Sequence, residues 1–332
     1  MQRTSFSSAV VLLTSLYVSA NAEQTLPQLN LAEQITLSGL SSGAYMAGQY
    51  HLAFAEHVSG VAMLSGGPVY CAQNSLGLAL EHCFNKETST PDLNAINQYL
   101  SAQQSAGKLA APSALAGDKV WIFHGQNDTT VHPKLAPVLQ QQYAQWLKQD
   151  NIALINNLPF AHTFPTDRQG LTSCAVSEPP YLASCQYDAA GTFLTFLYGS
   201  VKPKNAHTSG EMITLNQHQL APAARDTLAE QGYLYIPQNC LNGASCQLHV
   251  SFHGCKQNSA AVGDAYITGT GLNNYADSNN IVVLYPQTRA SNINPFNPNA
   301  CWDWWGYTGA DYATRDGRQM QAVNQLVNAI KN

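Results

Sequence analysis

Charged side chains are scarce in this sequence. Lysine, arginine, aspartate and glutamate together make up 11% of the 332 residues, against about 25% in an average protein. The formal net charge is −5, so the chain has no basic surface of the kind that holds nucleic acid. The expected surface is therefore polar but mostly uncharged, which suits a neutral substrate and excludes nucleic acid as a partner.

The sequence also lacks an apolar run long enough to cross a bilayer as a helix, which takes about 20 residues. One short apolar stretch, residues 9–18, follows Arg3 and precedes Ala20-Asn21-Ala22. A basic start, a short apolar core and a small-x-small motif are typical of a secretory signal peptide. We therefore expect residues 1–22 to be a signal peptide and residues 23–332 to be a single catalytic domain, exported to the periplasm or the medium and without a membrane partner. An N-terminal membrane anchor is the alternative.

No Ser/Thr-rich or Pro-rich linker divides the chain into separate domains. The eight cysteines include no Cys-x-x-Cys pair of the kind that a structural zinc site uses. An even number of cysteines in an exported protein indicates disulfides instead. Many pairings are open to eight cysteines. Pairing of neighbours, which gives short loops, predicts the bonds Cys71–Cys83, Cys174–Cys185, Cys240–Cys246 and Cys255–Cys301. We expect no metal ion and no cofactor.

Short β-rich runs alternate with longer helical patterns along the chain. This alternation favours an α/β fold with a mostly parallel central sheet and helices on both faces. The expected strands are residues 34–38, 58–64, 119–123, 152–156, 232–236, 247–252 and 281–285. The expected helices are residues 45–56, 133–149, 260–278 and 318–330.

A Gly-x-Ser-x-Gly motif, Gly39-Leu40-Ser41-Ser42-Gly43, lies between the first expected strand and the first expected helix. In that position the two glycines allow a sharp turn that lifts the serine hydroxyl above the sheet. The motif therefore indicates Ser41 as a nucleophile. The alternative is an ordinary Gly/Ser turn in which Ser41 or Ser42 caps the following helix.

A serine nucleophile needs a histidine base, and the base needs an acid that orients it. Asp128 and His162 follow the ends of two expected strands, in the order serine, acid, histidine. Open α/β sheets place their sites at the carboxyl ends of strands. We therefore predict the catalytic triad Ser41, Asp128 and His162.

Other residues compete with these choices. Asp118 precedes its strand and so falls at the wrong end of the sheet, and Asp167 lies only a few residues beyond His162. The remaining histidines near expected elements are interpreted as structural or solvated residues, namely His51, His57, His124 and His132. Of these, His124 is expected to form hydrogen bonds near Asp128.

Hydrolysis through a tetrahedral intermediate also needs two backbone N–H groups that hold its oxyanion. Ser42 is expected to supply one. The His253-Gly254-Cys255 motif follows a late strand, and Cys255 would supply the second if that strand lies beside the nucleophile strand. His253 would then shape the loop, and a Cys255–Cys301 disulfide would hold the amide still.

With these pieces in place, the sequence resembles the circularly permuted poly(3-hydroxybutyrate) depolymerases, within a wider esterase family that includes feruloyl and acetylxylan esterases. The resemblance covers nearly the whole expected mature chain and is carried by Gly39–Gly43, His124–Asp128, His162, His253–Gln257, Tyr285–Gln287 and Cys301–Trp305. In unpermuted relatives the last three motifs precede the serine motif. The resemblance implies a circularly permuted α/β-hydrolase fold, stapled by disulfides.

The resemblance further implies a secreted, monomeric serine esterase that hydrolyses a short-chain polyester or its oligomers through an acyl-enzyme on Ser41. Trp302, Trp304, Trp305 and Tyr307 would form the wall of the acyl-binding cleft, with core packing as the alternative for each. Many secreted depolymerases carry a separate substrate-binding domain. Because no linker is found here, adsorption to solid polymer would use the catalytic domain itself. A feruloyl or acetylxylan esterase and a non-catalytic secreted binding protein are the competing functions.

Overall fold

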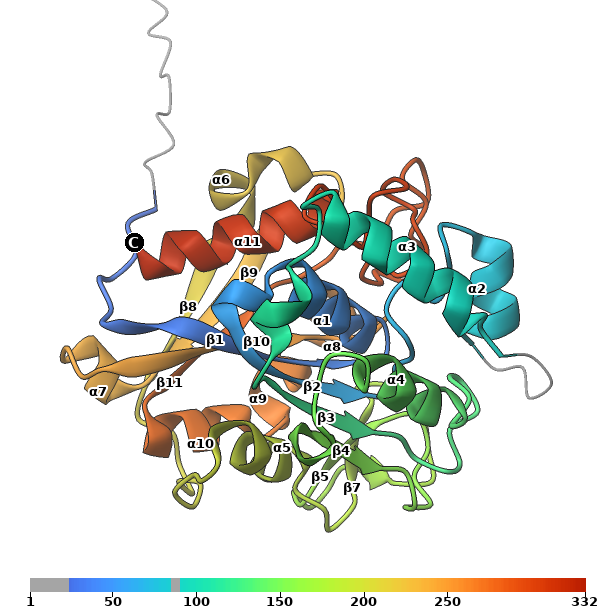
Figure 1. Cartoon of the computed structure of the whole chain (residues 1–332). Coiled ribbons are helices and arrows are strands. Elements are labelled where there is room, and N and C mark those ends of the chain that lie inside the picture. The colour runs from blue at the N-terminus through green and yellow to red at the C-terminus, as the bar shows by residue number, and fades with distance from the viewer. Residues whose placement is uncertain (1–23, 85–89) are drawn as a thin grey trace, which may run out of the picture.

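The computed structural model describes residues 24–84 and 90–332 (Figure 1). The predicted signal peptide lies outside these residues. In the described part of the chain, no helix has the combined length and apolar character that spanning a bilayer requires.

The centre of the fold is an eight-stranded sheet with the strand order β4-β3-β2-β1-β10-β11-β9-β8. The strands from β4 to β11 in this order pair in parallel, and β9 and β8 join antiparallel at one edge. The prediction of a mostly parallel sheet is confirmed. The strands are β1 (Leu31–Leu40), β2 (Val58–Leu64), β3 (Lys119–Phe123), β4 (Ile152–Ile155), β8 (Glu211–Asn216), β9 (Gln231–Ile236), β10 (Cys246–Phe252) and β11 (Ile281–Tyr285).

Helices cover both faces of the sheet (Figure 1). One face packs against α1 (Ser42–Ala53), α3 (Leu93–Ser105), α4 (Leu135–Tyr143) and α11 (Arg318–Lys331). The other packs against α5 (Ala189–Tyr198), α9 (Ala265–Gly269) and α10 (Leu272–Asn279). The remaining helices are short: α2 (Leu76–His82), α6 (Gln217–Leu220), α7 (Gln238–Leu241) and α8 (Ser259–Val262).

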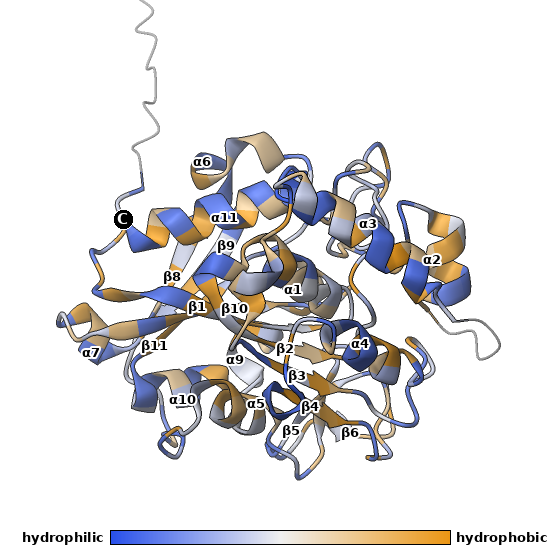
Figure 2. Cartoon of the chain, in the orientation of Figure 1, coloured by the Kyte–Doolittle hydropathy of each residue, from blue (hydrophilic) through white to orange (hydrophobic). Residues whose placement is uncertain are grey.

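The two hydrophobic cores follow from the alternation of side chains along each strand. In β3, Val120 and Ile122 enter the core beneath α1, whereas Trp121 and Phe123 enter the opposite core. Because both faces are covered, β3 and β11 are apolar at nearly every position, as is typical of buried parallel strands. The central strands β1 and β10 also carry buried polar residues, among them Thr36, Ser38 and His249. Helix α11 covers only one face, and it carries both hydrophilic and hydrophobic stretches in Figure 2.

Most of the predicted elements agree with the structure, and β2, β3 and β11 do so residue for residue. The single helix expected over residues 260–278 is wrong, because the chain there forms α8, α9 and α10 instead. Gly263 and Gly271 separate these helices with φ angles of 62° and 85°. Such positive φ values favour glycine and end an α-helix.

The described chain contains the four predicted disulfides, Cys71–Cys83, Cys174–Cys185, Cys240–Cys246 and Cys255–Cys301. The last one joins the loop after β10 to the segment that precedes α11. Strand β10 lies beside β1, with Gly39 opposite Phe252. This pairing is the one that a circular permutation requires, and the permutation itself stays an interpretation of the motif order.

A buried histidine lies between the two central strands. His249 is fully buried on β10, and its ring nitrogens lie 2.8 Å from Thr36 Oγ1 and 2.8 Å from Ser38 Oγ on β1. Burial lowers the pKa of His249 to about 3. Burial likewise lowers the pKa of His253 to about 4, against an opposing hydrogen bond with the Gly254 carbonyl. Both imidazoles therefore stay neutral in the folded protein at mildly acidic pH.

These histidines predict a loss of stability in acid. In the unfolded chain a histidine takes up a proton below about pH 6.5, whereas the folded chain keeps His249 neutral down to about pH 3. The unfolded state then binds more protons, so stability falls with pH by up to about 1.4 kcal/mol per pH unit for each such group. We expect His249→Asn to flatten the slope of unfolding free energy against pH between 6 and 4.5, measured by urea unfolding. An unchanged slope in the His249→Asn protein would contradict this prediction.

Candidate active site

Ser41 occupies a sharp turn between β1 and α1. Its φ and ψ angles are 59° and −121°, a conformation that costs a non-glycine residue about 1–3 kcal/mol and that clusters at functional sites. Its N–H donates to the Leu64 carbonyl at the end of β2 (2.9 Å). Its hydroxyl does not cap α1. The capping alternative is therefore excluded for Ser41, whose hydroxyl lies above the sheet.

The two glycines of the motif are needed because backbones approach closely on both sides of Ser41. A Cβ atom on Gly39 would lie 2.1 Å from the Gly43 carbonyl oxygen, and one on Gly43 would lie 2.2 Å from the Phe252 carbonyl oxygen. A larger residue at either position would therefore force the neighbouring backbone to move. The motif thus packs the start of α1 directly against β10.

Asp128 and His162 come together at the carboxyl ends of β3 and β4. The Nδ1 atom of His162 lies 2.7 Å from Asp128 Oδ2, and both residues are buried. The other carboxylate oxygen accepts the N–H groups of Thr130 and Val131, each at 2.9 Å. Asp128 is therefore held at both oxygens, which fixes the imidazole and leaves its Nε2 atom free of the acid.

The carboxyl group of Asp128 remains ionised in this setting. Burial opposes the charge, but the facing imidazole of His162 and hydrogen bonds from His124 and His162 outweigh it, so the pKa of Asp128 lies well below its usual range. His124 Nε2 lies 2.8 Å from the Val131 carbonyl and 3.2 Å from Asp128 Oδ2. His124 is thus a hydrogen-bonding neighbour of Asp128, as expected.

The competing residues lie elsewhere. Buried His51 and Asp118 pair with each other at 3.0 Å beneath α1, and burial raises the pKa of Asp118. Asp167 is exposed and pairs with Lys204 at 2.5 Å. Among the described residues, no group of three or more histidine, cysteine, aspartate or glutamate side chains could hold a metal ion.

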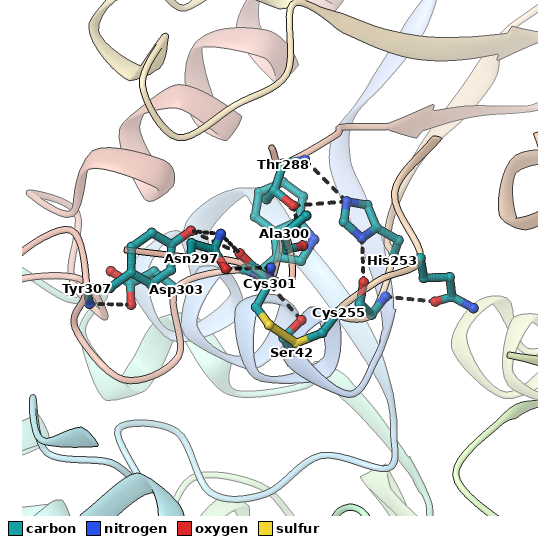
Figure 3. Close-up of a disulfide and its surroundings, with 12 residues drawn as sticks. Ser42, His253, Cys255, Thr288, Asn297, Ala300, Cys301, Asp303 and Tyr307 are labelled. Atoms are coloured by element: carbon teal, nitrogen blue, oxygen red, sulfur yellow. Dashed lines mark hydrogen bonds between the residues drawn. A yellow bond between two sulfur atoms is a disulfide. The ribbon is translucent and has the colours of Figure 1, made fainter. Parts of the chain in front are cut away.

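The loop after β10 lies against the nucleophile turn. A Cβ atom on Gly254 would lie 3.5 Å from the Cβ of Ser41. The next residue, Cys255, is tied by its disulfide to Cys301 (Figure 3). The N–H of Trp302, which follows Cys301, donates to Ser42 Oγ (3.3 Å). The loop and the start of α1 are therefore fixed to each other, with the predicted oxyanion donors on adjoining segments.

Ser41 and His162 open into one cavity of about 440 Å³. Ser42, Gly254 and Cys255 line the same cavity. All the residues predicted for the nucleophile, the base and the oxyanion donors therefore meet at one place, and Asp128 lies directly behind the base.

Two of the four residues predicted for the aromatic wall lie at the cavity. Trp304 and Trp305 line the cavity. Trp302 is fully buried and packs edge-on against Phe252, so its prediction as a substrate contact is wrong. Tyr307 does not line the cavity either, because its hydroxyl donates to the Cys301 carbonyl (2.9 Å) in the loop behind the wall.

Asp303 fixes the turn that presents the two tryptophans. Its carboxylate accepts the N–H groups of Gly306, Tyr307 and Thr308 at 2.7–3.0 Å and also the Thr308 hydroxyl. Burial raises the pKa of Asp303, although these hydrogen bonds oppose the rise. Asp303 therefore holds together the turn that contains Trp304 and Trp305.

Several apolar residues of the cavity could not be inferred from the sequence. They are Tyr45, Leu76, Leu80, Phe84, Val131, Tyr181 and Phe296. The available signal was the helix α2, whose leucines fall between the bonded cysteines Cys71 and Cys83. A disulfide-bounded helix with exposed leucines suggests a functional surface, but only the fold places it beside Ser41.

Comparisons with known proteins identify the family of this chain. The family model "Esterase PHB depolymerase" matches residues 232–331. A poly(3-hydroxybutyrate) depolymerase of Delftia acidovorans is 35% identical over 95% of this chain, which spans 63% of that protein's length. A polyhydroxybutyrate depolymerase of Talaromyces funiculosus is 34% identical over 96% of both chains.

Two solved structures are also similar. The crystal structure of PHB depolymerase from Penicillium funiculosum has a TM-score of 0.86 and 33% identity, covering 93% of this chain and 99% of that one. A serine-to-alanine variant of a PHB depolymerase complexed with R3HB trimer has a TM-score of 0.86 and 32% identity over the same shares. This chain therefore belongs to the esterase family of the PHB depolymerases.

Proposed function

We propose that this protein is a secreted serine esterase that hydrolyses poly(3-hydroxybutyrate), or its short oligomers, through an acyl-enzyme on Ser41. The observation that carries the proposal is the bond from His162 to Asp128 beside a strained Ser41, at the mouth of one apolar cavity. The named relatives support the substrate class. The four disulfides are typical of exported proteins and support secretion.

In the proposed reaction the ester carbonyl enters the cavity and Ser41 Oγ attacks it, while His162 Nε2 accepts the hydroxyl proton. Asp128 holds the imidazole by its Nδ1 atom and stabilises the imidazolium that forms. The backbone N–H groups of Ser42 and Cys255 donate to the oxyanion. His162 then gives its proton to the leaving hydroxyl, and water repeats the same steps to release the acid.

The cavity suits a chain of methyl-bearing ester units. Its lining is mostly apolar, and Lys256 and His162 are the ionisable lining residues other than tyrosines within the described part of the chain. Moving an uncharged polyester from water into such a cleft costs little desolvation free energy, and its methyl groups gain contact with apolar side chains. Trp304 and Trp305, which meet edge to face with ring centroids 5.4 Å apart, supply the broadest apolar surface.

Hydrolysis of a 3-hydroxybutyrate trimer, compared with that of methyl ferulate, tests the substrate class. We expect kcat/KM for the trimer to exceed that for methyl ferulate by at least about 100-fold, the size of effect that two or three well-filled apolar subsites supply. A higher kcat/KM for methyl ferulate would assign the protein to the other branch of its esterase family.

Adsorption to solid polymer is expected to use an apolar rim of the cavity, which we define as Leu76, Leu80 and Phe296. Their side chains are 54%, 49% and 60% exposed. Loss of about 60 Å² of apolar contact at about 25 cal/mol per Å² costs ~1.5 kcal/mol, a tenfold weaker adsorption. We therefore expect Phe296→Asn to lower binding to polyhydroxybutyrate granules about tenfold, measured by depletion of protein from solution.

The matched control for the rim is Met212→Asn on the edge strand β8, where the side chain is 39% exposed. It should adsorb like the parent. The Phe296→Asn protein should keep most of its activity on a small soluble ester, because Phe296 lies at the exposed rim of the cavity and a short substrate makes little contact there. Parental adsorption by Phe296→Asn would assign granule binding to another face.

A further inference from the structure

The loop after β10 carries the proposed second oxyanion donor, the backbone amide of Cys255. Within residues 24–84 and 90–332, the N–H of Cys255 donates to no acceptor. Its neighbours are all engaged: Gly254 N–H donates to Gln257 Oε1 (2.8 Å), and Lys256 N–H donates to the Asn299 carbonyl (2.7 Å). The Gly254 amide is thereby occupied, and of these three successive amides only that of Cys255 remains available to an oxyanion.

Gln257 makes a second set of contacts with the opposite wall of the cavity. The side chain is 1% exposed, and its Nε2 atom donates to the carbonyls of Pro180 (3.0 Å) and Tyr181 (3.4 Å). Both ends of the buried amide are therefore satisfied, as a buried amide requires. The Gln257 side chain thus links the loop at residues 253–257, which we call the oxyanion loop, to the segment at residues 177–181.

The segment at residues 177–181 also holds the general base. Ser177 Oγ donates to the backbone carbonyl of His162 (2.9 Å). The N–H of Phe164, two residues after the base, donates to the Tyr181 carbonyl (2.8 Å). The same carbonyl of Tyr181 therefore receives hydrogen bonds from the base segment and from Gln257.

We propose that Gln257 is a positioning residue that fixes the location of the Cys255 backbone amide relative to the His162 side chain. This inference rests on the proposed esterase function. Among the side chains of this length, only glutamine ends in an uncharged amide that both accepts and donates hydrogen bonds. A replacement therefore loses the bond to the Gly254 N–H, the bonds to the Pro180 and Tyr181 carbonyls, or both. The oxyanion forms only as Ser41 attacks, so a misplaced amide raises the barrier of the chemical step and leaves binding of the ester unchanged.

The test is Gln257→Met, which keeps the length of the side chain and removes both hydrogen bonds. Removal of a whole oxyanion donor costs about 10²–10³ in kcat, so displacement of one should lower kcat by about 10–100-fold. We expect KM for the 3-hydroxybutyrate trimer to stay within about threefold. The Ki of butaneboronic acid, which forms a tetrahedral adduct with the serine, should rise in parallel with the loss of kcat.

Gln142→Met is the matched control. Gln142 is also fully buried, accepts from the Val69 N–H (2.7 Å) and donates to the Val69 carbonyl (3.1 Å). Its loss should lower the thermal midpoint, like that of Gln257, without changing kcat or the Ki. A second variant, Gln257→Glu, keeps an acceptor for the Gly254 N–H but sets a carboxyl oxygen against the Pro180 and Tyr181 carbonyls, so it should also lower kcat.

Parental kcat and Ki in both Gln257 variants would overturn the inference while leaving the esterase function intact. A loss confined to KM, or a loss that Gln142→Met reproduces, would also overturn it and make Gln257 a purely structural residue. Failure of the proposed function itself would look different, because the parent protein would then hydrolyse neither the trimer nor a soluble ester.

Discussion

Ser41→Ala is expected to lower kcat for the 3-hydroxybutyrate trimer by about 10⁶-fold, the loss seen when a triad serine is removed. The turn at Ser41 and the helix α1 are held by backbone contacts such as Ser41 N–H to Leu64 O, so the variant should fold like the parent. Trimer binding should persist, since the rest of the cavity lining is unchanged. The rate is measured by release of 3-hydroxybutyrate monomer and dimer.

Two comparisons sharpen this result. The double variant Ser41→Ala/His162→Ala should be no slower than Ser41→Ala alone, because the two residues act as one unit. Ser65→Ala is the control, since Ser65 is another buried serine, at the end of the neighbouring strand β2. It should retain parental kcat. A Ser41→Ala protein with more than about 1% of parental kcat would contradict the nucleophile assignment, because the expected residual rate is far lower.

Asp128→Asn is expected to lower kcat by about 10⁴-fold without unfolding the protein. The structure gives a specific reason. Because Oδ1 of Asp128 accepts two backbone N–H groups, the amide oxygen of asparagine must take that place. The NH₂ group then faces His162 Nδ1, which becomes an acceptor, so the ring proton moves to Nε2. That tautomer cannot accept a proton from Ser41.

The substitution also turns the NH₂ group toward His124, whose Nε2 already donates to the Val131 carbonyl. Two donors then face each other in a buried site, and we expect stability to fall by about 1–3 kcal/mol. Stopped-flow ester hydrolysis and urea unfolding measure the two effects. A decrease in kcat of less than tenfold would mean that another group orients the base.

The sequence predicted the elements whose side chains are restricted by local patterns. Strand β11 is an unbroken apolar run, and β2 and β3 are apolar over residues 61–64 and 120–123, because both faces of these strands are buried. The helix expected over residues 260–278 failed because an apolar pattern does not reveal the backbone conformation of Gly263 and Gly271. Their positive φ angles divide it into three short helices.

The candidate site was predictable where chemistry and chain order coincide. Ser41, Asp128 and His162 each follow the end of a strand, so parallel pairing alone brings them to one edge of the sheet. The cleft wall was predicted less well. Trp302 and Trp304 differ by two positions in one loop, yet one is buried behind Ser42 and the other lines the cavity. Which face of a loop meets the substrate depends on packing from distant segments.

The oxyanion loop illustrates the same limit. The His253-Gly254-Cys255 motif indicated a loop near the nucleophile, and β10 does pair with β1. Nothing local marked Gln257 as a link to the base segment, because its partners, the carbonyls of Pro180 and Tyr181, lie far away in the chain. Such a link is visible only once the fold brings both segments to the same cavity.

Covalent labelling by a fluorophosphonate tests the central claim most directly, because the reagent reacts only with a serine that a base activates and that faces oxyanion donors. The account predicts one phosphonyl group per molecule, located by peptide mass spectrometry on Ser41, with no labelling of Ser41→Ala and much slower labelling of His162→Ala. Stoichiometric labelling of the Ser41→Ala protein, or of a parent peptide without this residue, would contradict it.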